Sequence, residues 1–415
     1  MEMSLIALAA ITLVYVLFLL KFLTIKKNHG YRNLPSGSLG LPLIGETLSF
    51  LHAHKKEQGA EWIDERVARY GPVFKTSLLG TPVVFIMGIA GNRYRLIKRA
   101  MLSFLKPESL QNYVKRMDDL VSASLLTEIK EKDSTIKTVS FMKKLTFNVA
   151  CDILFGIHDE ATKEAFLDDF YILFNALGSF PVKFPGSAYS KGLQARARIC
   201  DRLLPILRKR REALAAGVMC PTDDVVSCLL SLKDENEEPV SEGMVVDNFT
   251  ILIIASHDTT AVLLSLMVWK LSNDKQIYSE VLKEQMDILR DREARTEGKL
   301  TWVDIQKMKF TWQVFSVTHA THMEKDIFSS PTEFDPSRFD KSAKPLPPYA
   351  YIPFGAGLHS CIGNEFARIE ALTTIHNLVT KFEWSQVHPD ETITRKAMPY
   401  PSMGLPIKIR PRVTT

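Results

Sequence analysis

The sequence contains few cysteines, and their number is odd. Five cysteines occur in 415 residues, and no two of them form a C-x-x-C pair. This pattern argues against a disulfide framework and against a structural zinc site built only from protein ligands. It is typical of a chain in a reducing compartment, where each cysteine needs its own explanation. Internal repeats and low-complexity tracts are absent as well.

The chain also lacks a strong charge of either sign. Lys and Arg number 52 against 47 Asp and Glu, so the formal net charge is +5. This small, dispersed excess does not call for a nucleic-acid partner, although it suits a membrane surface or an acidic protein. The 46% apolar and 24% charged residues exclude a disordered or collagen-like chain. The length predicts one large catalytic body or two fused lobes, with appendages.

The N-terminus is not globular in character. Residues 3–20 carry no charge, and two further apolar residues follow Lys21, which gives nearly the length needed to cross a bilayer. Glu2 precedes this stretch, and four basic residues follow it: Lys21, Lys26, Lys27 and Arg32. We predict a transmembrane anchor over residues 1–25, with the N-terminus outside and the body in the cytosol. The alternative, a cleaved signal peptide, usually has a shorter apolar region preceded by a basic residue.

A Pro- and Gly-rich connector is expected over residues 26–45, because alternating Pro and Gly interrupt both helix and strand patterns. Residues 46–415 form the predicted body, which is mainly α with a minor β portion. A strand pair is predicted at 73–78 and 82–86. Apolar periodicity predicts helices at 56–70, 109–131, 137–155, 160–178 and 188–217.

An apolar stretch at residues 249–269 has one formal charge, Asp258, at its centre. A second membrane helix is the plain alternative, but polar side chains at mid-span are costly in lipid. We therefore predict a core helix whose polar centre lines a cavity. Ala255 and Thr259 are four residues apart and share one face, so a flat ligand can approach there. The Thr259 hydroxyl and the Asp258 carboxyl can pass protons into a dry site.

A lone cysteine, Cys361, lies in a glycine-rich loop near the C-terminus. Apolar periodicity resumes at Phe366, so a helix is expected to begin near Gly363. A cysteine beside a helix N-terminus is stabilised as a thiolate. Glycines let the backbone approach a planar group closely. An anionic sulfur without a partner cysteine suits a metal carried by a cofactor, whereas the structural alternative is an inert cysteine in a tight loop.

These two segments together resemble the cytochrome P450 family. The loop around Cys361 matches F-x-x-G-x-[RH]-x-C-x-G, and the segment Ala255 to Thr260 matches the family's long-helix motif. Residues 334–339 and the anchor with its connector also fit. The details are most similar to the plant microsomal branch that oxidises triterpenoids, steroids and taxane-type diterpenoids.

The resemblance implies a cytochrome P450 fold that binds haem b. Cys361 would be the axial thiolate on the haem iron, and His359 would donate to a haem propionate. Phe354 would shield the sulfur, Gly355 and Gly363 would belong to the cofactor loop, and Ala255 would line the haem face. Thr259 and Asp258 would deliver protons during oxygen activation.

The resemblance also implies the reaction and its partners. The expected activity is monooxygenation of a lipophilic terpenoid or sterol-like substrate with O2. Electrons would come from NADPH through NADPH–cytochrome P450 reductase, which would dock on a basic surface. The expected location is the endoplasmic reticulum membrane, single-pass, with the catalytic body in the cytosol.

The sequence departs from the family pattern at two places, near residues 93 and 314. The helix with the E-x-x-R motif is not found before the segment at 334–339. A W-x-V triplet at 312–314 stands where relatives have one such triplet before that helix and another after it. The pair Glu365 and Arg368 lies in the helix after the cysteine and is not counted as the motif. Near residue 93, Arg95, Lys98 and Arg99 are the candidates for the basic residue that holds a propionate.

These departures leave two hypotheses open. The first is a haem monooxygenase. The second is a truncated, catalytically inactive membrane-anchored isoform, or an artefact of the gene model, that binds haem poorly. A buried Arg338 without its usual partners would cost about 3–5 kcal/mol, which is large beside a total stability of about 5–15 kcal/mol.

Overall fold

The structure is a computed structural model that describes most of the body. The described residues are 35–41, 44–56, 58–78, 81–86, 92–129, 134–177, 179, 183–233, 237–316, 330, 333–339, 350–357, 360–394 and 398–412. The predicted anchor at 1–25 lies outside them. The chain divides into two compact units, the first formed by residues 1–95 and 175–194 and the second by 96–174 and 195–415.

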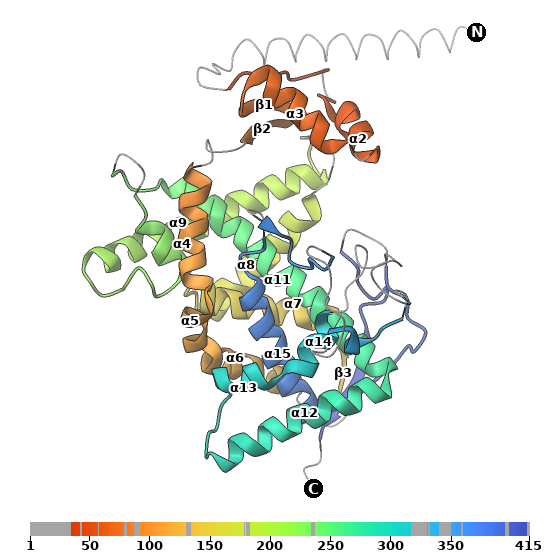
Figure 1. Ribbon diagram of the computed structural model, residues 1–415. Helices are drawn as coiled ribbons and strands as arrows, with labels where there is room; N and C mark the ends of the chain where they lie inside the picture. Colours follow the sequence, from red (N-terminus) through yellow and green to blue (C-terminus); the bar gives the residue numbers. More distant parts are fainter. Residues whose placement is uncertain are drawn as a thin grey trace. The chain divides into compact units, whose positions relative to one another are not determined.

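The first unit contains two helices and a strand pair (Figure 1). Its elements are α2 (Thr47–Lys55), α3 (Gly59–Tyr70), β1 (Val73–Leu78) and β2 (Thr81–Ile86), and the two strands pair in antiparallel register. The described part of the connector lies against β1. A side chain at Gly45 would place its Cβ 2.0 Å from the Ser77 carbonyl oxygen, so this approach requires glycine.

The second unit is mainly helical (Figure 1). It contains η2 (Gln111–Tyr113), η3 (Ala150–Leu154), α5 (Pro107–Leu110), α6 (Val114–Glu128), α7 (Thr138–Val149), α10 (Val225–Leu230), α11 (Glu242–Asn273), α12 (Lys275–Ala294), α13 (Trp302–Lys307), α14 (Lys309–Ser316), η4 (Pro336–Phe339) and α15 (Asn364–Lys381). Three helices, α4 (Asn92–Leu105), α8 (Glu160–Ala176) and α9 (Ala188–Ala215), have residues in both units. The predicted mainly helical body is confirmed.

A small sheet in the second unit joins distant parts of the chain. Its order is β3-β5-β4, with β3 at Ser134–Lys137, β4 at Phe382–Gln386 and β5 at Pro406–Pro411, and both pairings are antiparallel. The last strand therefore lies in the centre of the sheet. Its residues Ile407 and Ile409 point inward and are buried.

Helix α11 runs through the core of the second unit. Ser241 caps its N-terminus by accepting a hydrogen bond from the Met244 N–H at 3.3 Å. The helix packs against α7, α12 and α15. Among the described helices it is long and apolar enough to cross a membrane, but 61% of its most apolar window is buried inside the protein. This packing agrees with the predicted core helix.

Helix α15 is buried on most of its sides by α6, α11 and α12. It carries polar side chains into the core, and neighbouring helices satisfy several of them. The Asn377 amide donates to Asp118 Oδ1 on α6 at 2.7 Å, and the other Asp118 oxygen accepts from the Leu300 N–H at 2.9 Å. Asp118 thus holds together α6, α15 and the segment before α13.

Replacing Asp118 by Ala should lower the free energy of unfolding by about 1–3 kcal/mol, because two buried donors lose their acceptor. Chemical denaturation of the two proteins measures this difference. Asp119→Ala is the matched control, since the adjacent carboxylate pairs with Lys299 at 2.6 Å on the surface. That exposed pair is worth less than about 1 kcal/mol. Equal losses in both variants would contradict the role given to Asp118.

Candidate functional site

One face of α11 is exposed although the helix crosses the core. Ile251, Ala255 and Thr259 follow each other at four-residue spacing, so they form one stripe along the helix. All three are exposed, and Ile251 is 64% exposed. The Thr259 hydroxyl donates to the Ala255 carbonyl oxygen at 2.6 Å, within the same stripe. We call these three residues the α11 stripe.

Asp258 lies on a different face of α11 and is buried. Its Oδ1 atom lies 2.7 Å from Lys143 Nζ on α7 and accepts a hydrogen bond from the Tyr400 hydroxyl, also at 2.7 Å. The Lys143 ammonium also lies 4.5 Å from the centre of the Tyr400 ring. Burial, together with the bond to Asp258, raises the pKa of Tyr400, so the phenol stays protonated. The structure therefore directs Asp258 and Thr259 to different surroundings.

The cysteine loop precedes α15, as the sequence predicts. Cys361 is exposed, and its N–H donates to the Phe354 carbonyl oxygen at 2.7 Å. Gly355 and Gly357 have φ angles of 72° and 64°, a left-handed conformation that favours glycine. Gly363 is the residue before the first turn of α15. His359 lies outside the described residues.

The loop and the α11 stripe each have side-chain chemistry that suits a planar, apolar cofactor that carries a metal. Cys361 offers a soft sulfur ligand at a helix N-terminus, and the stripe offers apolar surface beside a small residue. A Cβ atom placed at Gly357 or Gly363 would meet no atom of the described residues within 4 Å, so this part of the chain leaves space beside the loop. Within the described ranges, no three His, Cys, Asp or Glu residues are grouped to hold a metal ion. A metal that is carried by a cofactor needs only one protein ligand of the kind that Cys361 offers.

A buried carboxyl group lies behind the site. Glu370, on α15, is fully buried, and within the described part of the chain neither of its oxygens has a hydrogen-bond partner. Burial raises the pKa of Glu370 well above its usual value, and the nearby Thr260 hydroxyl offsets this only in part. Burial therefore favours the protonated, neutral form of this carboxyl group.

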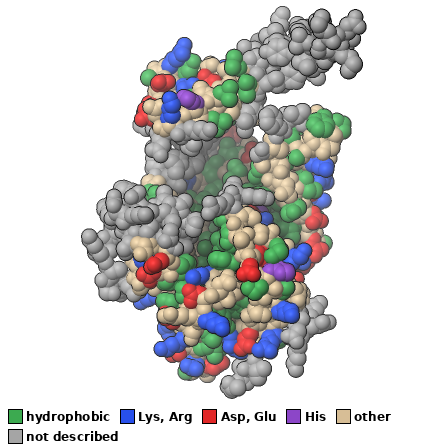
Figure 2. All heavy atoms as spheres, turned by 90° about the vertical axis from the view of Figure 1, so that its right-hand side faces the viewer, with side chains coloured by type: hydrophobic (Ala, Val, Ile, Leu, Met, Phe, Trp, Pro, Cys, Tyr) green, Lys and Arg blue, Asp and Glu red, His purple; other side chains and the backbone are tan. Residues whose placement is uncertain are grey.

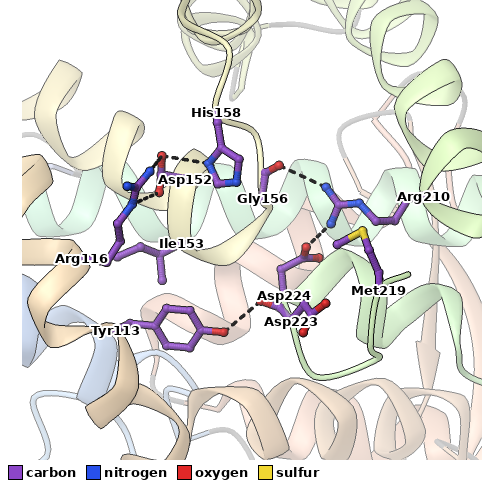
Figure 3. Close-up of a pocket in the computed structure, with 10 residues that line it drawn as sticks. All are labelled: Tyr113, Arg116, Asp152, Ile153, Gly156, His158, Arg210, Met219, Asp223 and Asp224. Atoms are coloured by element: carbon purple, nitrogen blue, oxygen red, sulfur yellow. Dashed lines mark hydrogen bonds and ion pairs between the residues drawn. The ribbon is translucent and has the colours of Figure 1, made fainter. Parts of the chain in front are cut away.

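A separate cleft of about 230 Å³ lies between α6, η3 and α9 (Figure 3). Arg116 donates to both oxygens of Asp152, at 2.9 and 3.0 Å, and Arg210 pairs with Asp224, which caps α10. Because each of these arginines already neutralises an aspartate in the cleft, we assign the cleft a role in joining helices. None of the predicted site residues lines it.

The sequence did not point to Lys143, Tyr400 or Glu370. Lys143 stands in an ordinary amphipathic helix, and Tyr400 lies 142 positions from Asp258 along the chain. Only the packing of α7, α11 and the C-terminal segment brings them to the acid. For Glu370 a weak signal was present, since it lies between the apolar residues Ile369 and Ala371 at the start of the buried part of the helix.

Comparison with known proteins places this arrangement in a family. The family model described as Cytochrome P450 matches residues 90–316 and 312–408. The chain is 31% identical to taxoid 14-beta-hydroxylase of Taxus cuspidata over 469 residues, covering 96% of this chain and 91% of the relative. It is 29% identical to beta-amyrin 28-monooxygenase of Kalopanax septemlobus over 484 residues, covering 99% of both chains.

A solved structure has the same fold. It is titled "Retinoic acid bound cyanobacterial CYP120A1" and matches with a TM-score of 0.68 and 24% identity, over 91% of this chain and 99% of that one. Fold and family match together define a haem-binding class of protein. The chain belongs to the cytochrome P450 family, whose members are haem monooxygenases. This confirms the resemblance to the plant members that oxidise terpenoids.

Replacing Glu370 by Gln should make the protein more stable relative to wild type as the pH rises from 5 to 8. In the unfolded chain this carboxyl ionises near pH 4.5, whereas in the folded protein its pKa is raised. The folded state therefore binds more protons, and its stability falls with rising pH. Gln removes this titration. Thermal unfolding at both pH values measures the effect.

Glu365→Gln is the control on the same helix, because that carboxylate is ion-paired with Arg368 at 2.6 Å. This variant should show no gain in stability toward pH 8. If the Glu370→Gln variant differed from wild type by the same amount at pH 5 and pH 8, the carboxyl would not be the buried neutral acid described above.

Proposed function

We propose that this chain is a haem-thiolate monooxygenase with Cys361 as the axial ligand of haem b. The observation that carries the proposal is the exposed Cys361 thiol, which stands at the start of α15 beside open space. Haem, when bound, supplies the activation of O2 and the insertion of one oxygen atom into a C–H bond. The chain supplies the thiolate, the apolar surface and the proton-bearing groups.

The residues around the cofactor have separable tasks. Ala255 is small, so the α11 stripe can lie close to a flat group. The Phe354 carbonyl oxygen accepts a hydrogen bond from the Cys361 N–H, and the Phe354 ring is proposed to shield the sulfur. Gly355 and Gly363 leave the cofactor side of the loop without side chains. His359 is proposed to donate to a haem propionate.

Proton transfer is proposed for Thr259 and Asp258. The Thr259 hydroxyl already points along the stripe, where its proton is held by the Ala255 carbonyl oxygen. Asp258 is an internal acid–base group paired with Lys143 and Tyr400. Both contacts are made by Oδ1, whereas Oδ2 has no hydrogen-bond partner among the described residues, so Oδ2 is the oxygen proposed to exchange a proton with the stripe.

The substrate is proposed to be a lipophilic terpenoid or sterol-like molecule. Relatives across nearly the whole chain are named as taxane and beta-amyrin oxidases, which act on polycyclic terpenoids. The exposed Ile251 on the α11 stripe suits an apolar substrate. We further propose electron supply from NADPH through NADPH–cytochrome P450 reductase.

The proposed location is the endoplasmic reticulum membrane, with residues 1–25 as a single anchor.

On the face drawn in Figure 2, Lys and Arg side chains stand beside Asp and Glu side chains. A mixed surface of this kind suits a protein partner rather than nucleic acid. A monomer tethered to the membrane completes the proposal.

A second candidate is a truncated form that holds haem weakly and is not catalytic. The alignment with taxane 10-beta-hydroxylase runs over 478 positions and covers 98% of this 415-residue chain, so it places gaps in this chain. The two family matches also overlap at residues 312–316, at the W-x-V triplet. The first observation supports missing segments in this chain, and the second supports this junction as the place of one of them.

The ferrous carbon-monoxide spectrum of the purified full chain separates the two candidates. A stoichiometric complex with the thiolate-type Soret shift supports the monooxygenase and contradicts the truncated form. In that case Cys361→Ser should abolish the shift, because a hydroxyl does not replace the thiolate. Cys220→Ser is the control, since that thiol is exposed and lies outside the loop. Loss of haem from wild type, with intact helical content, supports the truncated form. Sequencing the transcript across codons 312–317 then shows whether the gap belongs to the gene.

Thr259→Ala should divert electrons from product to hydrogen peroxide in the haem-loaded, reductase-coupled protein. The hydroxyl is the proton-bearing group on the α11 stripe, and general acid catalysis is worth roughly 10²–10⁴-fold in such steps. Peroxide formed per NADPH consumed is the quantity measured. Thr259→Ser keeps the hydroxyl and should restore coupling. Unchanged coupling in the Ala variant would remove Thr259 from proton delivery.

A further inference from the structure

We propose that Trp312 is a positioning residue for the Cys361 loop, acting through Phe354. This inference rests on the proposed function of Cys361 as haem ligand. The Trp312 ring on α14 and the Phe354 ring of the loop lie 6.3 Å apart between centroids, with their planes at 15°. This is an offset, nearly parallel pair of the kind that attracts. Both rings are half-buried.

The helix that carries Trp312 is a rigid support. Glu284 on α12 accepts hydrogen bonds from the Phe310 N–H at 2.7 Å and the Thr311 N–H at 2.9 Å, which caps the first turn of α14. The Thr311 hydroxyl donates to the same carboxylate at 2.6 Å. Farther along α14, Val314 and Phe315 are buried in the core. The position of Trp312 is therefore fixed from both ends of its helix.

Phe354 transmits this position to the cysteine. Its carbonyl oxygen accepts the Cys361 N–H at 2.7 Å, so the backbone of one residue holds the backbone of the other. Between them, Gly355 and Gly357 have left-handed backbones and no side chains with which to anchor the loop. The Phe354 ring is thus the apolar group of the loop that contacts α14 through Trp312, while Ile362 packs against the core.

A second, weaker connection runs from the neighbouring residue. The Gln313 side-chain amide donates to the Phe339 carbonyl oxygen at 3.3 Å. The centroid of the Phe339 ring lies 4.7 Å from the centroid of the Tyr351 ring, and Tyr351 is three residues before Phe354. Loss of Trp312 is therefore expected to loosen the loop without releasing it entirely.

This attachment lies beside the junction where the family motif is not found. Arg338, which relatives use in a buried charged network, here donates to the backbone carbonyl oxygens of Ser330 at 2.8 Å and Glu333 at 3.3 Å. The aromatic pair connects the last helix before that junction directly to the cysteine loop. In this chain it supplies a positional restraint on the sulfur that does not depend on the E-x-x-R motif.

Hydrogen–deuterium exchange of the full chain without haem tests the inference. The reporter is the peptide that contains the Cys361 N–H, and the reference is a peptide from α6. Trp312→Leu should speed exchange in the reporter by about two- to tenfold, the opening expected from losing one aromatic pair. Trp312→Phe should keep exchange near the wild-type rate. Trp302→Leu is the matched control, because that half-buried ring contacts Arg368 instead.

Phe354→Leu removes the partner ring without altering α14. The inference can therefore still be tested if a Trp312 variant misfolds. It should speed exchange of the reporter as much as Trp312→Leu, and the double variant should be no faster than either single variant. An unchanged reporter in Phe354→Leu, or effects that multiply in the double variant, would overturn the proposal.

Haem-loaded protein gives the functional readout. The fraction of the carbon-monoxide complex with the thiolate-type band should fall in Trp312→Leu and recover in Trp312→Phe. If wild type shows no such band, the proposed function fails while the exchange result on the loop stands. If the band is present and the exchange does not change, only the role of Trp312 fails.

Discussion

The burial of α15 is the constraint on which the site depends. A helix with His376 and Asn377 in the interior is stable where neighbouring residues satisfy these polar groups. Asp118 meets Asn377, and Gln285 meets His376 at 2.9 Å. Burial also lowers the pKa of His376 to about 3, which keeps its ring neutral. Cys361 lies three residues before the first residue of α15. The packing of this helix in the core therefore restricts where the sulfur can lie.

Helix α11 divides its chemistry between two faces. The exposed stripe presents a hydroxyl and apolar surface, whereas Asp258 is buried in an ion pair with Lys143. Removing one partner of a buried ion pair costs about 3–5 kcal/mol, so this arrangement resists change. The Asp258 carboxylate therefore lies on a buried face of α11 and not on the exposed stripe. Lys143 and Tyr400 both contact its Oδ1 atom and fix the orientation of the carboxylate.

Much of the fold could be predicted because its signals are local. The polar interruption at Asp258 excluded a membrane helix, and the packing of α11 agrees. The start of α15 followed from the return of apolar periodicity after Gly363. Tyr400, Lys143 and Trp312 could not be predicted, since each acts through a partner far away in the chain. The spacing of apolar residues along the sequence predicts a helix. It does not predict which side chains of other elements will contact that helix.

The order of the small sheet has a consequence for biosynthesis. Strand β5 follows both β3 and β4 along the chain, yet it is the middle strand that both of them need as a partner. Glu391 ties the adjoining turn to the interior by accepting from the Met403 N–H at 2.5 Å and the Leu405 N–H at 3.1 Å. Until β5 has been synthesised, β3 has an unpaired edge that can pair with another chain. The nascent polypeptide must therefore be shielded over the long interval between β3 and β5, and a premature stop ahead of β5 leaves both β3 and β4 without their partner strand.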